Sequence, residues 1–182
     1  MCIRCSRRQW LAGAGVLVLA GLVGCDGNAP VGVQAGAAPA VLDADAECAV
    51  CGMRVRGFPG PKAQAIALVG QQRRSLFFCS TRDFFAFVQQ PENRQAQAAL
   101  YVQDMTGADW NRPETAPWIP AHDAFYVPSR KLTGAMGPTF AAFATREAAG
   151  KWAGEQGESE VLGFAEIDQG RVMGLGEGHH HH

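Results

Sequence analysis

The fold is decided by residues 63–79, which read AQAIALVGQQRRSLFFC. The segment from Ala63 to Val69 alternates partly between apolar and polar side chains and is flanked by Gly and Pro, which predicts a β-strand. Residues 70–72 predict a turn, and Ser75–Cys79 predicts the returning strand of a hairpin. We therefore expect an antiparallel strand pair near the start of the globular part of the chain.

A helix is predicted directly after this hairpin. Thr81 or Ser80 is a suitable N-cap, and Pro91 marks the end of the helix. The apolar positions follow the i, i+3, i+4 spacing of a helix face and are Phe84, Phe87 and Val88. Leu100–Val102 then predicts a further short strand.

The second half of the chain repeats this plan. Residues 124–127 and 139–143 predict two strands, Thr145 opens a helix that runs to about Gln156, and residues 161–165 predict a closing strand. The Thr-Arg-acid helix start at 81–83 recurs at 145–147. We therefore predict an α+β fold of two tandem ββαβ units, at about 47–105 and 122–175.

The N-terminus has the features of an export signal. Three arginines precede an uncharged, apolar and Gly-rich stretch, and residues 22–25 read LVGC, which resembles a lipobox. We expect cleavage of residues 1–24 and lipidation of Cys25, whose acyl chains would anchor the protein to a membrane. An ordinary signal peptide with a chance cysteine is the alternative, and Sec export and twin-arginine export both stay open.

Residues 25–46 follow the signal and read as a flexible tether. Beyond Cys25 this stretch has no aromatic residue and is rich in Ala, Gly and Pro, so as a flexible coil it would span about 25 Å. The expected globular domain covers residues 47–175. Residues 176–182 resemble a linker and a His tag, and their exclusion leaves His122 as the single natural histidine.

Charge and motif content exclude several classes of function. The 182-residue chain carries a net charge of −1, which becomes about −4 once Arg4, Arg7 and Arg8 leave with the signal. A mildly acidic domain without a basic stripe argues against nucleic-acid binding. The sequence also lacks a phosphate-binding glycine loop, G-x-S-x-G and HExxH, so we predict that the protein is not an enzyme.

Three cysteines remain once the signal and the lipidated residue are set aside. They are Cys48, Cys51 and Cys79. An odd number of thiols cannot pair off completely into disulfides in an oxidising compartment. At least one of them must therefore be free, buried or a metal ligand.

The segment Cys48–Met53 reads CAVCGM and is the sharpest local motif. The Cys51 thiolate and the Met53 thioether are both soft donors, which suit copper(I) better than zinc or magnesium. Gly52 between them allows the backbone to fold back, so that both sulfurs could converge on one ion. The alternative is that both residues pack as ordinary buried hydrophobic side chains.

Two other kinds of site use a C-x-x-C motif. A thioredoxin-type dithiol needs the N-terminus of a helix after the motif, whereas residues 52–61 predict a loop. A structural zinc site needs four ligands, and only Cys79 and His122 remain, at irregular spacing. Both kinds of site are therefore less favoured than copper.

Other sulfur and imidazole donors lie elsewhere in the sequence. Met105 follows a predicted strand end in a Gly-containing connection, and Met136 lies in a glycine-rich stretch. Either methionine could equally be a core residue. A lone histidine such as His122 could be a hydrogen-bonded structural residue or a ligand.

Several segments, in order along the chain, resemble the NosL family. They are the lipobox, the CxxCGM motif and residues 78–83 (FCSTRD), 101–104 (YVQD), 124–127 (AFYV), 134–138 (GAMGP) and 143–144. The resemblance implies a copper(I)-binding lipoprotein of the periplasm of a denitrifying bacterium. Such a protein would deliver copper for maturation of nitrous oxide reductase, together with an ABC-type membrane complex. The choice between inner and outer membrane stays open, as does the choice between monomer and homodimer.

The same resemblance implies a ligand set. It makes Cys51 and Met53 the core copper ligands, Met105 a third ligand and His122 a fourth. By this comparison Cys48 either assists or merely neighbours the site. Cys79 and Met136 look structural, and Ala135 stands where the family pattern has Pro.

Two alternative functions stay open at this point. One is a thiol–disulfide redox protein that uses Cys48 and Cys51 to keep copper-site cysteines reduced. The other is a structural subunit that only recruits partners.

Overall fold

A computed structural model describes residues 38–69, 72–94 and 97–176. The predicted signal peptide, Cys25 and most of the predicted tether lie outside these residues, as does the C-terminal tag. None of the helices in the described part of the chain is both long enough and apolar enough to cross a membrane.

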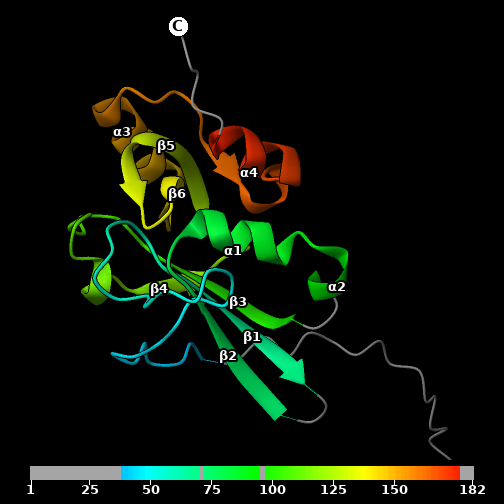
Figure 1. Cartoon of the computed structure of the whole chain (residues 1–182). Coiled ribbons are helices and arrows are strands. Elements are labelled where there is room, and N and C mark those ends of the chain that lie inside the picture. The colour runs from blue at the N-terminus through cyan, green and yellow to red at the C-terminus, as the bar shows by residue number, and fades with distance from the viewer. Residues whose placement is uncertain (1–37, 70–71, 95–96, 177–182) are drawn as a thin grey trace, which may run out of the picture. The chain divides into compact units, whose positions relative to one another are not determined.

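The first sheet is a four-stranded antiparallel sheet with the order β2-β1-β3-β4 (Figure 1). Its strands are β1 (Ala63–Val69), β2 (Gln72–Phe78), β3 (Gln97–Gln103) and β4 (Trp118–Pro120). The predicted hairpin is confirmed, with Ala63 opposite Phe78 in the register. The returning strand begins earlier than expected, at Gln72, because Arg73 and Arg74 continue the pairing with β1.

Helix α1 (Thr81–Val88) begins where the sequence predicts, directly after β2. Ser80 is the N-cap, and its hydroxyl accepts a hydrogen bond from the backbone N–H of Asp83 at 3.1 Å. The buried side of α1 includes Phe84, Phe85 and Val88. The helix ends at Val88, and a four-residue helix, α2 (Pro91–Arg94), begins at Pro91.

The second sheet has three antiparallel strands in the order β6-β5-β7. They are β5 (Phe125–Gly134), β6 (Gly137–Phe143) and β7 (Leu162–Gly163), and α3 (Arg146–Gln156) lies between β6 and β7 in the chain. The closing strand is shorter than predicted. A 3₁₀ turn (Phe164–Glu166) replaces its second half, and the Glu166 carboxylate accepts a hydrogen bond from the Gly163 N–H at 2.7 Å.

The chain order therefore contains two ββαβ units, β1-β2-α1-β3 and β5-β6-α3-β7, and the predicted α+β class is confirmed. Four further elements of the described residues were not predicted. They are α2, β4, a 3₁₀ turn at Pro113–Thr115 in the connection between the units, and α4 (Gln169–Gly176) at the end of the second unit.

Helix α1 joins the two units, because its first turn is bonded to the free edge of β6. The hydroxyl of Thr81 donates to the carbonyl oxygen of Phe140 and accepts from the Phe140 N–H at 3.1 Å. The Phe85 ring packs edge-on against Tyr126 and Phe140, with centroid distances of 5.0 and 5.5 Å. Helix α1 thus provides hydrogen-bond partners for the backbone of an edge strand and also fills the core beneath that strand.

Residues before Glu47, the predicted first residue of the domain, already pack against the rest of the protein. Leu42 is buried in the main core, and the Ala40 N–H donates to the Gln64 side-chain oxygen at 3.0 Å. Arg56 donates to the Leu42 carbonyl at 2.6 Å. The last residues of the predicted tether therefore lie against the first sheet.

Candidate metal centre

The CxxCGM segment forms a tight turn. The Cys48 N–H donates to the Met53 carbonyl at 2.8 Å, and the Gly52 N–H donates to the Cys48 carbonyl at 2.9 Å. Gly52 has a φ of +71°, a left-handed conformation that glycine adopts without steric cost. Gly52 thus lets the backbone fold back between Cys51 and Met53. That the two sulfurs converge on one ion stays a prediction.

The segment that carries this turn lies beside the end of β2. Cys48 forms a parallel bridge with Phe77, and the Ala49 N–H donates to the Phe77 carbonyl at 2.9 Å. Cys79 lies two residues beyond Phe77, so this pairing brings it to the turn. The Sγ atoms of Cys51 and Cys79 are 3.5 Å apart.

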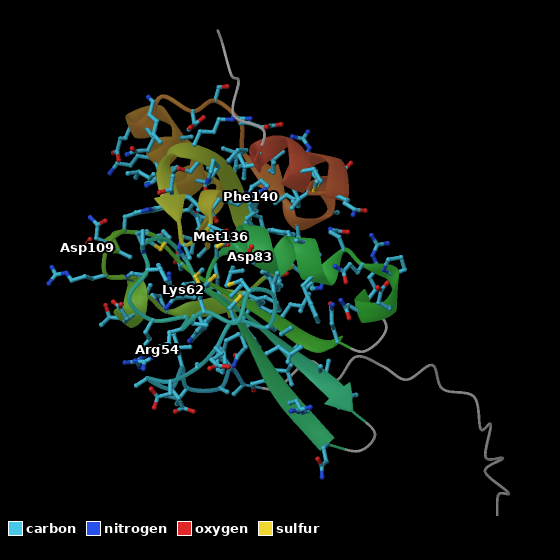
Figure 2. The ribbon with its side chains drawn as sticks, viewed as in Figure 1. Arg54, Lys62, Asp83, Asp109, Met136 and Phe140 are labelled. Carbon is cyan, nitrogen blue, oxygen red and sulfur yellow. The ribbon has the colours of Figure 1, made fainter. Side chains whose placement is uncertain are left out.

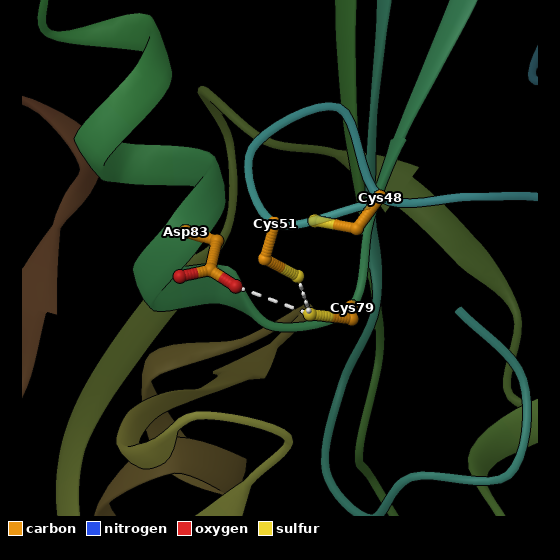
Figure 3. Close-up of side chains that lie close together, drawn as sticks. All are labelled: Cys48, Cys51, Cys79 and Asp83. Carbon is orange, nitrogen blue, oxygen red and sulfur yellow. Dashed lines mark hydrogen bonds between the residues drawn. The ribbon is translucent and has the colours of Figure 1, made fainter. Parts of the chain in front are cut away.

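The first turn of α1 adds a carboxylate to the two cysteines. The Cys79 thiol donates to the Oδ2 oxygen of Asp83 at 3.1 Å. One ligand atom from each of Cys48, Cys51, Cys79 and Asp83 lies within 4.8 Å of the others. We call these four residues the cysteine centre, and Figure 3 shows their side chains converging from the turn, the end of β2 and α1.

Access to the cysteine centre is one-sided. Cys48 and Cys79 are buried, at 3% and 0% exposure, whereas Cys51 and Asp83 are only half-buried. All three cysteines are free thiols. An ion or a reagent from solvent therefore meets Cys51 before it meets the other two sulfurs.

The thiols do not ionise independently. The neighbouring Cys79 side chain lowers the pKa of Cys48 below that of an ordinary thiol. The pKa of Cys79 is raised by Cys48, by burial and by Asp83, and burial raises the pKa of Cys51. The three thiols are therefore coupled, so that a negative charge on one sulfur opposes the loss of a proton from the next. A bound cation would favour the thiolate forms, because metal binding to cysteine releases protons.

A buried lysine supports the loop that follows the motif. Lys62 is 1% exposed, and its ammonium donates to the carbonyl oxygens of Phe58, Pro59 and Gly60 at 2.7, 3.0 and 2.9 Å. Burial lowers the pKa of Lys62 to about 8, although negative charge at Cys79 acts in the opposite direction. Lys62, which is labelled in Figure 2, is therefore a buried cationic group that lies near enough to Cys79 to interact with a negative charge there.

Met53 lies two residues beyond Cys51 in the CxxCGM turn. It is half-buried and packs against the same core cluster as Cys51. The cysteine centre itself offers three thiols and one carboxylate, and Met53 adds a thioether to the same turn. Thiolates and thioethers suit copper(I), whereas the carboxylate is a hard donor that copper(I) does not require.

Met105 and His122 are not brought to the cysteine centre. Met105 is buried in a separate cluster that includes Val127 and Phe143. The His122 ring packs on Phe164 with a centroid distance of 4.1 Å, and it lines a cavity of about 550 Å³. Their roles as copper ligands stay predictions.

Met136 lies at the tip of the β5–β6 hairpin and is 49% exposed, so it is not a core residue (Figure 2). Its carbonyl accepts a hydrogen bond from Arg82 at 3.5 Å, next to the first turn of α1.

Sequence reasoning missed Cys79 and Asp83 as members of the candidate site. Cys79 was interpreted as structural, and Asp83 only as part of a helix start. The signal that could have found Cys79 was the odd count of three thiols. Asp83 lies four residues beyond Cys79, but only the strand-to-helix turn at Ser80 shows that both side chains point the same way.

Comparisons with known proteins agree over most of the chain. A family model described as NosL matches residues 39–172. The chain is 42% identical over 154 residues to the copper-binding lipoprotein NosL of Stutzerimonas stutzeri, covering 85% of this chain and 77% of the relative. It is 37% identical over 126 residues to the copper-binding lipoprotein NosL of Achromobacter cycloclastes, covering 68% of this chain and 64% of that relative.

A solved structure is similar as well. The crystal structure of the copper chaperone NosL from Shewanella denitrificans superposes with a TM-score of 0.66 at 34% identity. The superposition covers 74% of this chain and 97% of that structure.

Proposed function

The chain belongs to the NosL family, and from this premise we propose that it is a lipid-anchored copper(I) chaperone of the periplasm, not an enzyme. It binds one copper(I) ion at the cysteine centre and gives it to a partner that matures nitrous oxide reductase. The relatives it resembles are described as copper-binding lipoproteins and as a copper chaperone.

The observation that carries the proposal is the convergence of Cys51 with two further thiols at the CxxCGM turn. Cys51 is the first ligand, because it is the half-buried sulfur that an incoming ion meets. Met53, from the same turn, is the second ligand. Soft sulfur donors at this density favour copper(I) over harder divalent ions.

The one-sided access suits a carrier. Copper(I) held by two or three sulfurs keeps an open coordination position on the side of Cys51. A thiolate or imidazole of the partner can enter there before the first ligand leaves, so the ion passes through a shared intermediate and is never free in solution.

The proposed anchor sets where delivery takes place. Lipidated Cys25 holds the protein on a membrane, and the tether after it lets the domain reach a membrane-bound ABC-type complex. Confinement to a surface raises the effective concentration of the chaperone at that partner. Cys25 lies outside the described residues, so this part of the proposal rests on the sequence and on the lipoprotein relatives.

The decisive experiment is a copper(I) titration of reduced, tag-free protein against a chromophoric copper(I) chelator. A chaperone binds one equivalent and releases it to a competing thiol ligand. The alternative redox function predicts a reversible Cys48–Cys51 disulfide without copper affinity. Failure to withdraw copper(I) from the chelator would contradict the proposal.

A further inference from the structure

Cys51 and Cys79 have the geometry of a dithiol that can be oxidised. Their Sγ atoms are already in contact at 3.5 Å, although 28 residues separate them in the chain (Figure 3). A disulfide needs an S–S distance of about 2.05 Å, so roughly 1.5 Å of approach is required. Of the two residues, Cys51 is half-buried and Cys79 is buried, so Cys51 has the freer side chain to make this approach.

We propose that Cys51 and Cys79 form a redox-active pair, and that its oxidation by a small disulfide such as glutathione disulfide closes the copper site. The pair differs from the one that the C-x-x-C motif suggests. The Sγ–Sγ contact in the cysteine centre joins Cys51 to Cys79, while Cys48 is fixed in the turn by the hydrogen bonds of its backbone N–H and carbonyl to Met53 and Gly52. Cys48 therefore takes no part in the disulfide.

The difference in exposure sets the order of the two exchange steps. Cys51, the sulfur that solvent reaches, attacks one sulfur of the oxidant and displaces the first small thiol, leaving a mixed disulfide on Cys51. The buried Cys79 then attacks the Cys51 sulfur and displaces the second small thiol. Two protein thiols lose two electrons and two protons, and the oxidant gains them as two thiols.

Oxidation removes the copper ligand. A sulfur in a disulfide carries no thiolate charge and is a poor ligand for copper(I), because the thiolate is the form that binds metals. This consequence rests on the proposed function, whereas the disulfide itself depends only on the positions of the two sulfurs. Copper binding and oxidation of the pair should therefore exclude each other.

The test is disulfide mapping of the full chain without the His tag. Reduced, metal-free protein is incubated with glutathione disulfide without oxygen, alkylated, digested and analysed by mass spectrometry. The expected product is a cross-link between the peptides of Cys51 and Cys79, with Cys48 alkylated. A Cys48–Cys51 cross-link, or no cross-link within the chain, would overturn the proposal.

Two variants separate the roles of the sulfurs. Cys48→Ser is the matched control and should form the same cross-link as the wild type. Cys79→Ser should instead retain a glutathione adduct on Cys51, because the second thiol is missing. Absence of that adduct would rule out Cys51 as the first attacking sulfur. If either variant fails to fold, the wild-type map still decides which pair forms.

Copper(I) titration of the mapped, oxidised wild type tests the switch. Stoichiometric binding should be lost and should return after reduction with a phosphine. Oxidised protein that binds copper(I) as tightly as reduced protein would overturn the switch. If the reduced protein itself binds no copper(I), the proposed function fails and the switch with it, while a mapped Cys51–Cys79 cross-link would still support the redox pair.

Discussion

Cys79 donates its thiol hydrogen to the Oδ2 oxygen of Asp83, at an Sγ–Oδ2 distance of 3.1 Å. This bond spans the junction between the end of β2 and the first turn of α1, with Ser80 as the helix cap between the two residues. The cysteine centre is therefore fixed by a strand-to-helix turn on one side and by the CxxCGM turn on the other.

Asp83→Asn tests whether this carboxylate is a ligand or a neighbour. Asparagine keeps the size of the side chain and a carbonyl acceptor, and soft copper(I) does not require a hard oxygen donor. We expect one equivalent of copper(I) to bind, as in the wild type, in the chelator competition. Loss of stoichiometric binding in a folded variant would make Asp83 part of the copper site.

Met53→Leu and Met105→Leu compare two predicted ligands that the fold places in different clusters. Leucine nearly conserves the volume of methionine, so each variant should lose less than about 1.5 kcal/mol of stability. Even a residue that only supports a metal ligand costs about tenfold or more in affinity when it is lost. We therefore expect Met53→Leu to weaken copper(I) binding by at least that factor.

Met105→Leu should have a smaller effect, and Met173→Leu, which changes an exposed methionine, should have none. Equal losses for the first two variants would show that Met105 reaches the copper ion in the bound state.

Thr81→Val tests the joint between the two units. The substitution removes the hydroxyl that bonds both the N–H and the carbonyl of Phe140 in the buried edge of β6. An unsatisfied buried polar group costs about 1–3 kcal/mol, so the free energy of unfolding should fall by about 1 kcal/mol or more. Urea unfolding measures this loss. Thr81→Ser keeps the hydroxyl and is the control. A variant as stable as the wild type would mean that the joint does not depend on this hydroxyl.

Lys62 predicts a dependence of stability on pH. Its pKa is about 8 in the folded protein and 10.5 in an ordinary lysine. Between these two values the unfolded chain binds more protons than the folded one, so the contribution of Lys62 makes the free energy of unfolding rise with pH.

Lys62→Met removes this contribution. As the pH rises from about 8 to 10.5, the free energy of unfolding of the wild type should therefore increase relative to that of the variant. Urea unfolding of both proteins across this range measures the change. A constant difference across this window would show that Lys62 titrates normally in the folded protein.

The sequence predicted those parts of the fold whose signals are local. The hairpin at residues 63–79 follows from its apolar runs and turn, and both main helices begin at a Ser or Thr N-cap. The shortened last strand was not predictable in this way. Its apolar residues 161–165 suit a strand, but the Glu166 carboxylate bonds back to Gly163 and turns the chain into a 3₁₀ helix.

The candidate site was predicted only in part, for a related reason. Cys51 and Met53 lie within one motif, so their proximity is a local property. Cys79 joins them through the bridge between Cys48 and Phe77, a contact across 29 residues that no periodicity reveals. Met105 and His122 were grouped with the motif through the family resemblance. The fold places Met105 in a separate core cluster and the His122 ring against Phe164, and their roles as ligands stay predictions.

The most direct test of copper(I) binding at the cysteine centre is the chelator competition on Cys51→Ser. A hydroxyl cannot replace the soft thiolate that copper(I) meets first. We expect loss of stoichiometric binding, with circular dichroism and thermal unfolding close to those of the wild type. A folded Cys51→Ser protein that holds copper(I) with wild-type affinity would contradict it.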